Sequence, residues 1–172
     1  INNGTGTFKN LTINNAGLVA TLGANTTLNG DLAITAGSLD VSGSFYSLTV
    51  KGNWVNSGTF IARTGSTATV TLSSLTAGSI TLNPGASSFN HLTINGGVST
   101  VYVLTTNNLS TAGQVTITNS ELNLNGLTFN MGDNVGSDAI NIFGTLNVNQ
   151  GAFLKMGKAA SLTVNSGGTV KI

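Results

Sequence analysis

The sequence predicts an all-β protein, and within that class a parallel β-solenoid of about seven or eight coils. Three observations support this prediction. Apolar–polar–apolar triplets recur about every 7 to 10 residues. Gly and Asn occupy the segments between the triplets, and only 6% of the 172 residues are charged. Since side chains alternate between the faces of a strand, each triplet places two residues inward and one outward.

The triplets mark the expected strands along the whole chain. In the first part of the chain they are residues 11–13, 32–34, 39–41, 48–50, 70–72 and 80–82. In the second part they are 92–94, 101–103, 115–117, 122–124, 140–142, 146–148, 162–164 and 170–172. The residue in the middle is usually Thr or Asn, and Thr suits a half-exposed pleated surface because it is β-branched.

Turn residues separate the triplets. Asn-Gly pairs occur at 3–4, 29–30, 95–96 and 125–126, and both residues tolerate the positive φ that tight corners require. No window keeps a 3.6-residue period. The best helical candidate, residues 150–161, is short and is interrupted by Gly151 and Gly157. We therefore expect no helix.

Two all-β architectures compete for this pattern. Strands this short favour a solenoid, because strands in antiparallel sandwiches run to about five or six residues. The 23 Asn and 26 Thr residues favour it too, since both can form ladders between equivalent positions of successive coils. Low charge fits as well, because like charges stacked about 4.8 Å apart repel. An antiparallel β-sandwich or jelly roll remains the alternative.

An internal repeat divides the chain. Residues 8–14 match residues 89–95, and residues 34–43 match residues 117–126, with the inward apolar positions kept in both comparisons. We expect a single solenoid domain, 1–172, made of two related halves, about 1–88 and 89–172. The one proline, Pro84, lies near the junction.

Composition excludes several classes of function. Six Lys and Arg against five Asp and Glu leave too little positive charge for nucleic-acid binding. The absence of Cys excludes disulfides and thiolate metal sites. No apolar stretch is long enough for a membrane-spanning helix. We expect neither a nucleic-acid partner nor membrane insertion.

The residues that could carry catalysis are sparse, so we expect no enzyme. His91 is the single histidine, and its partner in the repeat is Asn10, which suggests that the position needs only a polar residue. Asp31 and Asp40 correspond to Gln114 and Asn123 in the second half, so a pair of acids is not repeated.

Weak candidate sites remain. Asp133 and Asp138 lie in an oxygen-rich segment that could bind calcium weakly, and no other cofactor is expected. Sequons at Asn3, Asn10, Asn25 and Asn108 are possible glycosylation sites.

Outward-reading side chains offer two further possibilities. Thr67-Ala68-Thr69-Val70-Thr71 resembles an ice-binding array, but we interpret it as ordinary strand surface because no regular echo is evident. Tyr46 and Tyr102 read as outward and are the aromatic residues expected to contact a partner.

Several sequence segments resemble the repeats of large bacterial surface and secreted β-helix proteins. They are Phe-x-x-Leu-Thr-Ile-Asn, which occurs twice, and residues 38–43 and 48–60. Filamentous-haemagglutinin-like adhesins and autotransporter passengers contain such repeats. The resemblance implies a right-handed parallel β-helix with an extracellular, adhesive or structural role. Richness in Asn and Thr is also similar to that of prokaryotic extracellular filament subunits.

These observations lead to a hypothesis about function. Strand-like pattern starts at Thr7-Phe8 and continues to Ile172, with no capping helix or charge cluster at either end. We expect a non-enzymatic extracellular module that assembles head to tail with copies of itself, unless it is a piece of a longer solenoid. The residues expected at the contact are Thr7, Phe8, Leu11, Ile13, Val170 and Ile172. A ligand-binding solenoid, for ice or for a host or surface glycan, is the alternative.

Overall fold

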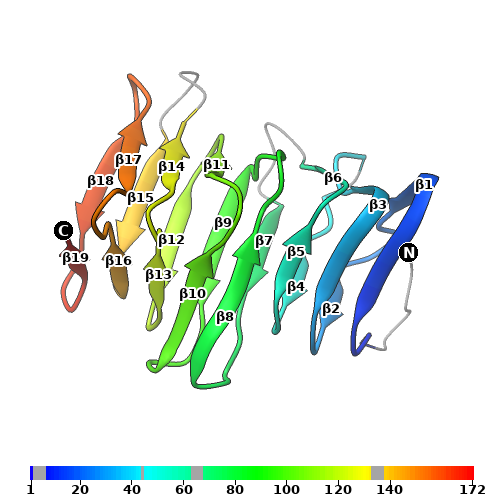
Figure 1. Cartoon of the computed structure of the whole chain (residues 1–172), viewed down its shortest axis with the longest axis horizontal. Coiled ribbons are helices and arrows are strands. Elements are labelled where there is room, and N and C mark those ends of the chain that lie inside the picture. Colours follow the sequence, from blue (N-terminus) through cyan, green and yellow to red (C-terminus); the bar gives the residue numbers. More distant parts are fainter. Residues whose placement is uncertain (2–6, 44, 63–67, 133–137) are drawn as a thin grey trace.

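The computed structural model describes residues 1, 7–43, 45–62, 68–132 and 138–172. These residues form 19 β-strands and no helix, and the paired strands are parallel throughout. The strands stack side by side along one axis, with the N-terminus and the C-terminus at opposite ends (Figure 1). The predicted parallel β-solenoid is confirmed, and the antiparallel sandwich is wrong.

Three sheets form the sides of the solenoid in the described part of the chain. The nine-stranded sheet contains β1 (Leu11–Thr21), β3 (Leu32–Asp40), β5 (Trp54–Asn56), β6 (Thr59–Ile61), β8 (Gly78–Asn83), β10 (Thr100–Leu104), β13 (Glu121–Asn123), β16 (Thr145–Asn147) and β19 (Thr169–Lys171). The seven-stranded sheet contains β2 (Thr26–Leu28), β4 (Leu48–Val50), β7 (Thr69–Leu72), β9 (His91–Asn95), β12 (Val115–Thr118), β15 (Ala139–Ile142) and β18 (Ser161–Val164). The three-stranded sheet contains β11 (Leu109–Thr111), β14 (Thr128–Met131) and β17 (Phe153–Met156).

The seven-stranded sheet contributes one strand to each coil, so the solenoid has about seven coils. Leu48 pairs with Val70 and Val70 with Leu92, an advance of 22 residues in each step. The advance grows to 25 residues between Val115 and Ile140. The register of the strands is kept, and the extra residues of a longer coil lie in its corners. A one-residue slip in a strand would turn each inward side chain outward.

Gly37 lies at a bend within β3, which pairs with two strands of the next coil. The first part of β3 pairs with β5, and residues after Gly37 pair with β6. Gly37 has a φ of +83°, and a Cβ at this position would come within 2.2 Å of the Asn15 carbonyl oxygen. Glycine is therefore required at this bend.

The core consists of columns of apolar side chains that run through the coils. One column, Leu48, Val70, Leu92, Val115 and Ile140, is buried along its whole length. Trp54, Phe60 and Phe89 fill a wider part of the core, with ring centroids 5.0 to 5.5 Å apart. Burial of such columns supplies the main favourable term in folding.

One strand has the opposite register from the one predicted. Thr100, Tyr102 and Leu104 face the core in β10, whereas Val101 and Val103 face outward. Tyr102 is fully buried, and its hydroxyl oxygen accepts a hydrogen bond of 2.6 Å from the backbone N–H of Ser74. Because the ring is apolar and the hydroxyl has a partner, burial is favourable. The prediction that Tyr102 contacts a partner is wrong.

The matched segments of the internal repeat lie on different sides of the solenoid. Residues 11–13 belong to β1 in the nine-stranded sheet, whereas their counterparts 92–94 belong to β9 in the seven-stranded sheet. Asn10 and His91 nevertheless have the same role, since each accepts a backbone N–H from the next coil. The repeat is thus a local corner-and-strand motif used at different corners.

Substitution of a core residue tests the inward register. Leu122 is fully buried between Tyr102 and Leu146, so Leu122→Ala should cost about 2–5 kcal/mol and Leu122→Asp more. Asp40→Asn is the matched control, because an amide oxygen can replace the carboxylate that accepts the Ser42 N–H at 2.7 Å. It should change the free energy of unfolding by less than about 0.5 kcal/mol. Urea denaturation measures all three, and an unchanged Leu122→Asp variant would contradict the register.

Candidate functional site

A column of threonines crosses the outer face of the seven-stranded sheet. The pairs Thr27↔Thr49, Thr49↔Thr71, Thr71↔Thr93 and Thr93↔Thr116 are adjacent in register. Asn141 interrupts the column in β15, and Thr163 resumes it in β18. Equivalent atoms recur along it at about the 4.8 Å spacing of parallel strands.

The interpretation of the Thr residues as unrelated strand surface is therefore incomplete. The sequence contains the signal, because the middle residues of the triplets at 48–50, 70–72, 92–94, 115–117 and 162–164 are all Thr. The intervals between these triplets identify them as the same side of successive coils. The segment Thr67-Ala68-Thr69-Val70-Thr71 does not show this repeat, because it runs along one strand whereas the Thr column runs from strand to strand. Residue 67 lies outside the described residues.

Side-chain oxygens and nitrogens connect successive coils at the corners, forming what we call the corner ladder. On one corner, Oδ1 of Asn10, Asp31 and Asn53 accept the backbone N–H groups of Asp31, Asn53 and Thr81 at 2.7 to 2.8 Å. On another, Ser47 donates its N–H to Asn25, Thr69 donates to Ser47, and Gln114 donates to His91. These bonds satisfy N–H groups where the chain leaves the regular sheet.

His91 belongs both to the corner ladder and to a shallow hollow on the sheet. Its Nδ1 accepts the N–H of Gln114 at 2.9 Å. The hollow has a volume of about 220 Å³ and is lined by Thr69, His91, Leu92, Thr93, Gln114 and Thr116. It lies over β7, β9 and β12, so the lining comes from three successive coils. The sequence did not indicate this hollow.

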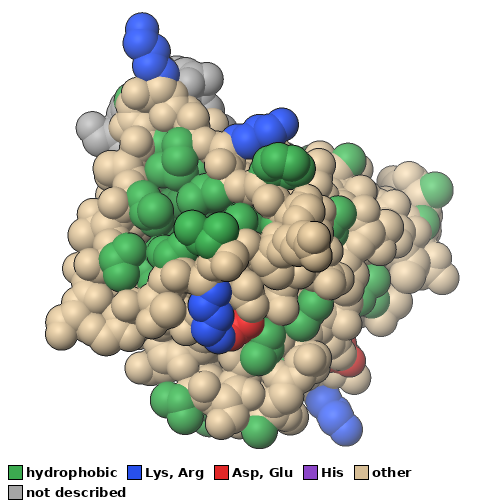
Figure 2. All heavy atoms as spheres, turned by 60° about the vertical axis from the view of Figure 1, so that its left-hand side comes forward, with side chains coloured by type: hydrophobic (Ala, Val, Ile, Leu, Met, Phe, Trp, Pro, Cys, Tyr) green, Lys and Arg blue, Asp and Glu red, His purple; other side chains and the backbone are tan. Residues whose placement is uncertain are grey.

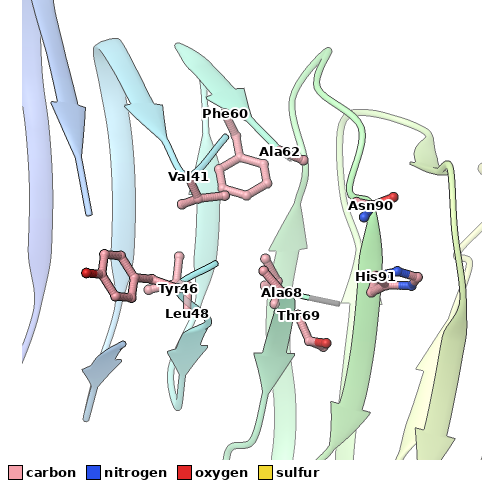
Figure 3. Close-up of a pocket in the computed structure, with 10 residues that line it drawn as sticks. Val41, Tyr46, Leu48, Phe60, Ala62, Ala68, Thr69, Asn90 and His91 are labelled. Carbon is pink, nitrogen blue, oxygen red and sulfur yellow. The ribbon is translucent and has the colours of Figure 1, made fainter. Parts of the chain in front are cut away.

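A second pocket lies at the adjacent corner (Figure 3). Val41, Leu48, Phe60 and Ala62 make one side apolar. Its free volume of about 10 Å³ is at the lower limit for a single water molecule, so it has no room for an organic ligand. Tyr46 lines this corner and is 36% exposed, in keeping with the outward position expected for it.

The possible catalytic residues are dispersed. Asp31 accepts N–H groups from Asn53 in the corner ladder, and Asp40 accepts the N–H of Ser42. His91 lies in the neighbourhood of threonines and Gln114. No group of three or more His, Cys, Asp and Glu that could hold a metal ion occurs among the described residues. The expectation of no enzyme stays a prediction.

The other candidate positions are placed as follows. Asp138 is 6% exposed, whereas Asp133 lies outside the described residues, so the calcium site stays a prediction. Among the sequons, Asn10, Asn25 and Asn108 are exposed and use Oδ1 as an acceptor for the next coil. Asn3 also lies outside the described residues.

The C-terminal end of the solenoid exposes side chains that face inward. Leu162 and Val164 continue the columns of Ile140 and Ile142, but they are 40% and 49% exposed because none of the described residues packs over them. Figure 2 shows the apolar patch at this end. We call it the open end, and define it as Leu154, Met156, Leu162, Val164 and Val170.

The residues predicted for assembly have unequal exposure. Thr7 is exposed, Phe8 and Leu11 are half-buried, and Ile13 is buried at 2%. Val170 is half-buried at the open end, and Ile172 beside it is fully exposed. The core is thus more open at the last coil than at the first.

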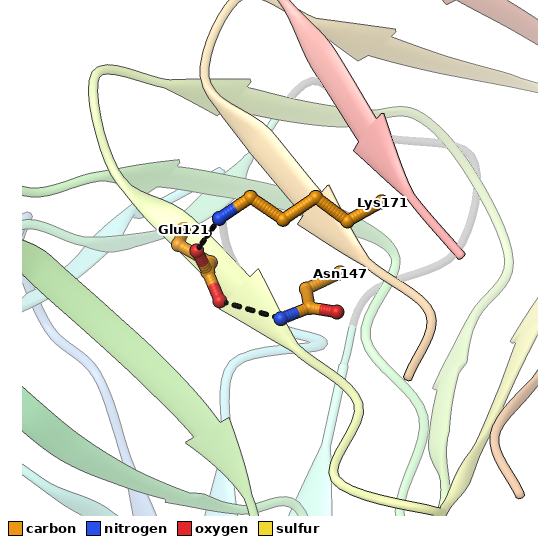
Figure 4. Close-up of polar contacts among 3 residues, drawn as sticks. All are labelled: Glu121, Asn147 and Lys171. Atoms are coloured by element: carbon orange, nitrogen blue, oxygen red, sulfur yellow. Dashed lines mark hydrogen bonds and ion pairs between the residues drawn. The ribbon is translucent and has the colours of Figure 1, made fainter. Parts of the chain in front are cut away.

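An ion pair ties the last strand to strands below it (Figure 4). Lys171 in β19 lies 2.7 Å from Oε2 of Glu121 in β13, and Nδ2 of Asn147 in β16 donates to Oε1 at 2.9 Å. Burial raises the pKa of Glu121, but the hydrogen bonds from Lys171 and Asn147 and the charge of Lys171 outweigh it. The pKa of Glu121 therefore lies below its usual value.

Comparisons with known proteins give no further guide to the site. No family model, curated protein or solved structure matches the chain. Within the described ranges, no helix is long and apolar enough to cross a membrane.

The corner ladder can be tested at His91. His91→Asn should leave stability nearly unchanged, because Asn10 already shows that an amide oxygen can accept the same kind of N–H. His91→Ala removes the acceptor and should cost about 0.5–1.5 kcal/mol. Chemical denaturation of both variants makes the comparison, and equal losses would show that the imidazole acts through packing instead.

The Glu121 ion pair should make stability depend on pH. A carboxyl whose pKa is lowered by folding stabilises the protein above its unfolded pKa, and this stabilisation is lost as pH falls through the folded pKa. Glu121→Gln should therefore be less stable than the parent by up to about 1 kcal/mol at pH 7. The difference should shrink towards about pH 3. Denaturation at both pH values provides the measurement, and a difference that grows at acid pH would contradict the assignment.

Proposed function

We propose that the chain is a non-enzymatic structural or adhesive module of an extracellular surface, which builds a fibre by stacking end to end. The open end carries this proposal. Its five apolar side chains continue the core columns and are not covered by any of the described residues. Burial of exposed apolar surface favours association.

A second copy of the chain is the occupant that fits this end. β17, β18 and β19 are edge strands of the three sheets, and their outer backbone groups resemble those that each coil presents to the next. At the other end, β1 is the edge of the nine-stranded sheet. Stacking β1 of one copy on β19 of another would continue the parallel order by β-augmentation. Such a contact joins unlike surfaces and does not close, so it produces a filament.

Low charge supports the same arrangement. The net charge is +1, so little electrostatic repulsion opposes the stacking of copies. The extracellular location and the adhesive role rest on the resemblance of the repeats to bacterial surface β-helix proteins.

Charge substitution at the open end tests the assembly. Leu162→Lys with Val164→Lys should abolish polymerisation while leaving the fold intact, because both side chains are already partly exposed. The matched control is Leu75→Lys with Val98→Lys, at two exposed apolar residues that are not part of the open end. Light scattering coupled to size-exclusion chromatography, with electron microscopy, distinguishes fibres from particles. Deleting residues 168–172 should likewise give a folded, non-polymerising chain.

Three outcomes would contradict this proposal. A parent chain that stays monomeric at high concentration has no end-to-end contact. Discrete dimers would indicate that two open ends meet each other, which closes the assembly. Equal loss of polymers in the open-end variant and its control would show that general surface hydrophobicity drives association.

The second candidate is a ligand-binding solenoid, for ice or carbohydrate. The Thr column is the observation that favours it, since it presents the same hydroxyl on successive coils. The neighbouring column on one side of the sheet has a different residue type on each coil. Its residues are Asn25, Ser47, Thr69, His91 and Gln114.

A further inference from the structure

We propose that the hollow over β7, β9 and β12 binds a neutral oligosaccharide. This site is on the side of the solenoid and is independent of the open end. Its lining combines hydroxyl groups, an amide and an imidazole with the edge of Leu92. Polar groups that converge on a hollow can fix the orientation of a ligand and provide specificity.

The side chains of Thr93, Thr116 and Gln114 are available to a ligand in the hollow. The hydroxyls of Thr93 and Thr116 make no hydrogen bond within the described part of the chain, and neither does the side-chain amide of Gln114. A hydroxyl both donates and accepts, and an amide offers two donors and an acceptor. The hollow can thus exchange several hydrogen bonds with the hydroxyls of a sugar.

The corner ladder also holds His91 in a position to donate a hydrogen bond to a sugar. Because Nδ1 accepts the Gln114 N–H, the proton of the neutral imidazole is on Nε2. Nε2 is therefore a donor, and the bond to the next coil restrains the ring. Figure 3 shows the imidazole extending away from the corner pocket. A restrained donor loses less freedom on binding than a mobile one.

Charge and spacing select the class of ligand. The lining contains no Lys, Arg, Asp or Glu, so phosphate, sulfate and uronic acid groups would find no counter-charge. Successive coils are about 4.8 Å apart, which is close to the length of one sugar ring in an extended chain. A glycan that runs along the solenoid axis would therefore meet equivalent hydroxyls at each ring.

We include Tyr46, which lines the corner pocket next to the hollow, in the proposed site. Tyr46 and His91 line the same corner pocket, and His91 also lines the hollow. Ser47, the residue after Tyr46, accepts the N–H of Thr69, another lining residue. An exposed aromatic ring provides a flat apolar surface for the C–H face of a sugar, which the hydroxyls of the hollow cannot provide.

Calorimetric titration of the full chain with cellohexaose, xylohexaose and mannohexaose tests the proposal. At least one should bind at millimolar concentrations, and Thr93→Val with Thr116→Val should weaken it at least about tenfold. The matched control, Thr145→Val with Thr169→Val, changes an adjacent Thr pair in the nine-stranded sheet, away from the Thr column, and should bind as the parent does. His91→Asn should also weaken binding, because it keeps the acceptor for Gln114 but removes the ring and its Nε2 donor.

The results that would overturn the sugar site are distinct from those that concern assembly. Absence of heat with all three oligosaccharides, or equal weakening by both double variants, would exclude it. Inhibition of ice growth by the parent, lost in the Thr93→Val and Thr116→Val variant but kept in the control, and without sugar binding, would assign the column to ice. Sugar binding by a chain that stays monomeric would support the hollow and contradict only end-to-end stacking.

Discussion

The fold depends on one constraint: each coil must return to the same register over the coil before it. Parallel pairing places Leu48 beside Val70 and Val70 beside Leu92, which makes continuous columns of inward side chains. Where the chain is longer, as between Trp54 and Leu82, the added residues lie between strands. Corners therefore vary in length while the strands conserve their pattern, since a slip by one residue would expose the core.

The same constraint accounts for the unusual composition. At the corners, N–H groups need acceptors from the next coil, and short polar side chains such as Asn10, Ser47 and Asn108 provide them. On the outer faces, like residues lie next to like residues, so neutral Thr and Asn stack without repulsion. Charge is tolerated where it is paired across coils, as in the contact between Glu121 and Lys171. Much of the Asn and Thr content thus has a structural role.

The sequence predicted the solenoid and most inward residues because alternation is a local signal. It misassigned Tyr102, since alternation within residues 101–103 does not show which set of side chains faces inward, and the Tyr102 hydroxyl has a buried partner, Ser74, 28 residues away. The Thr column can be predicted from the sequence, but only after each triplet has been assigned to a side of the coil. The hollow at His91 could not be predicted, because it depends on which side chains neighbouring coils bring together. Of the open end, the sequence indicated Val170 but not Leu154, Met156, Leu162 or Val164, whose exposure depends on the packing of the last coil.

The direction of the hydrogen bonds also determines how the molecule bears load. The strands cross the solenoid axis, so the backbone bonds between coils point along that axis, as do the bonds of the corner ladder. Tension applied along the axis loads all coils equally, so the coil with the weakest contacts opens first. Each coil of 22 residues then releases roughly 70 Å of chain. A fibre of such coils would lengthen in small steps under force and absorb energy at each one, behaving as an extensible tether and not as a rigid rod.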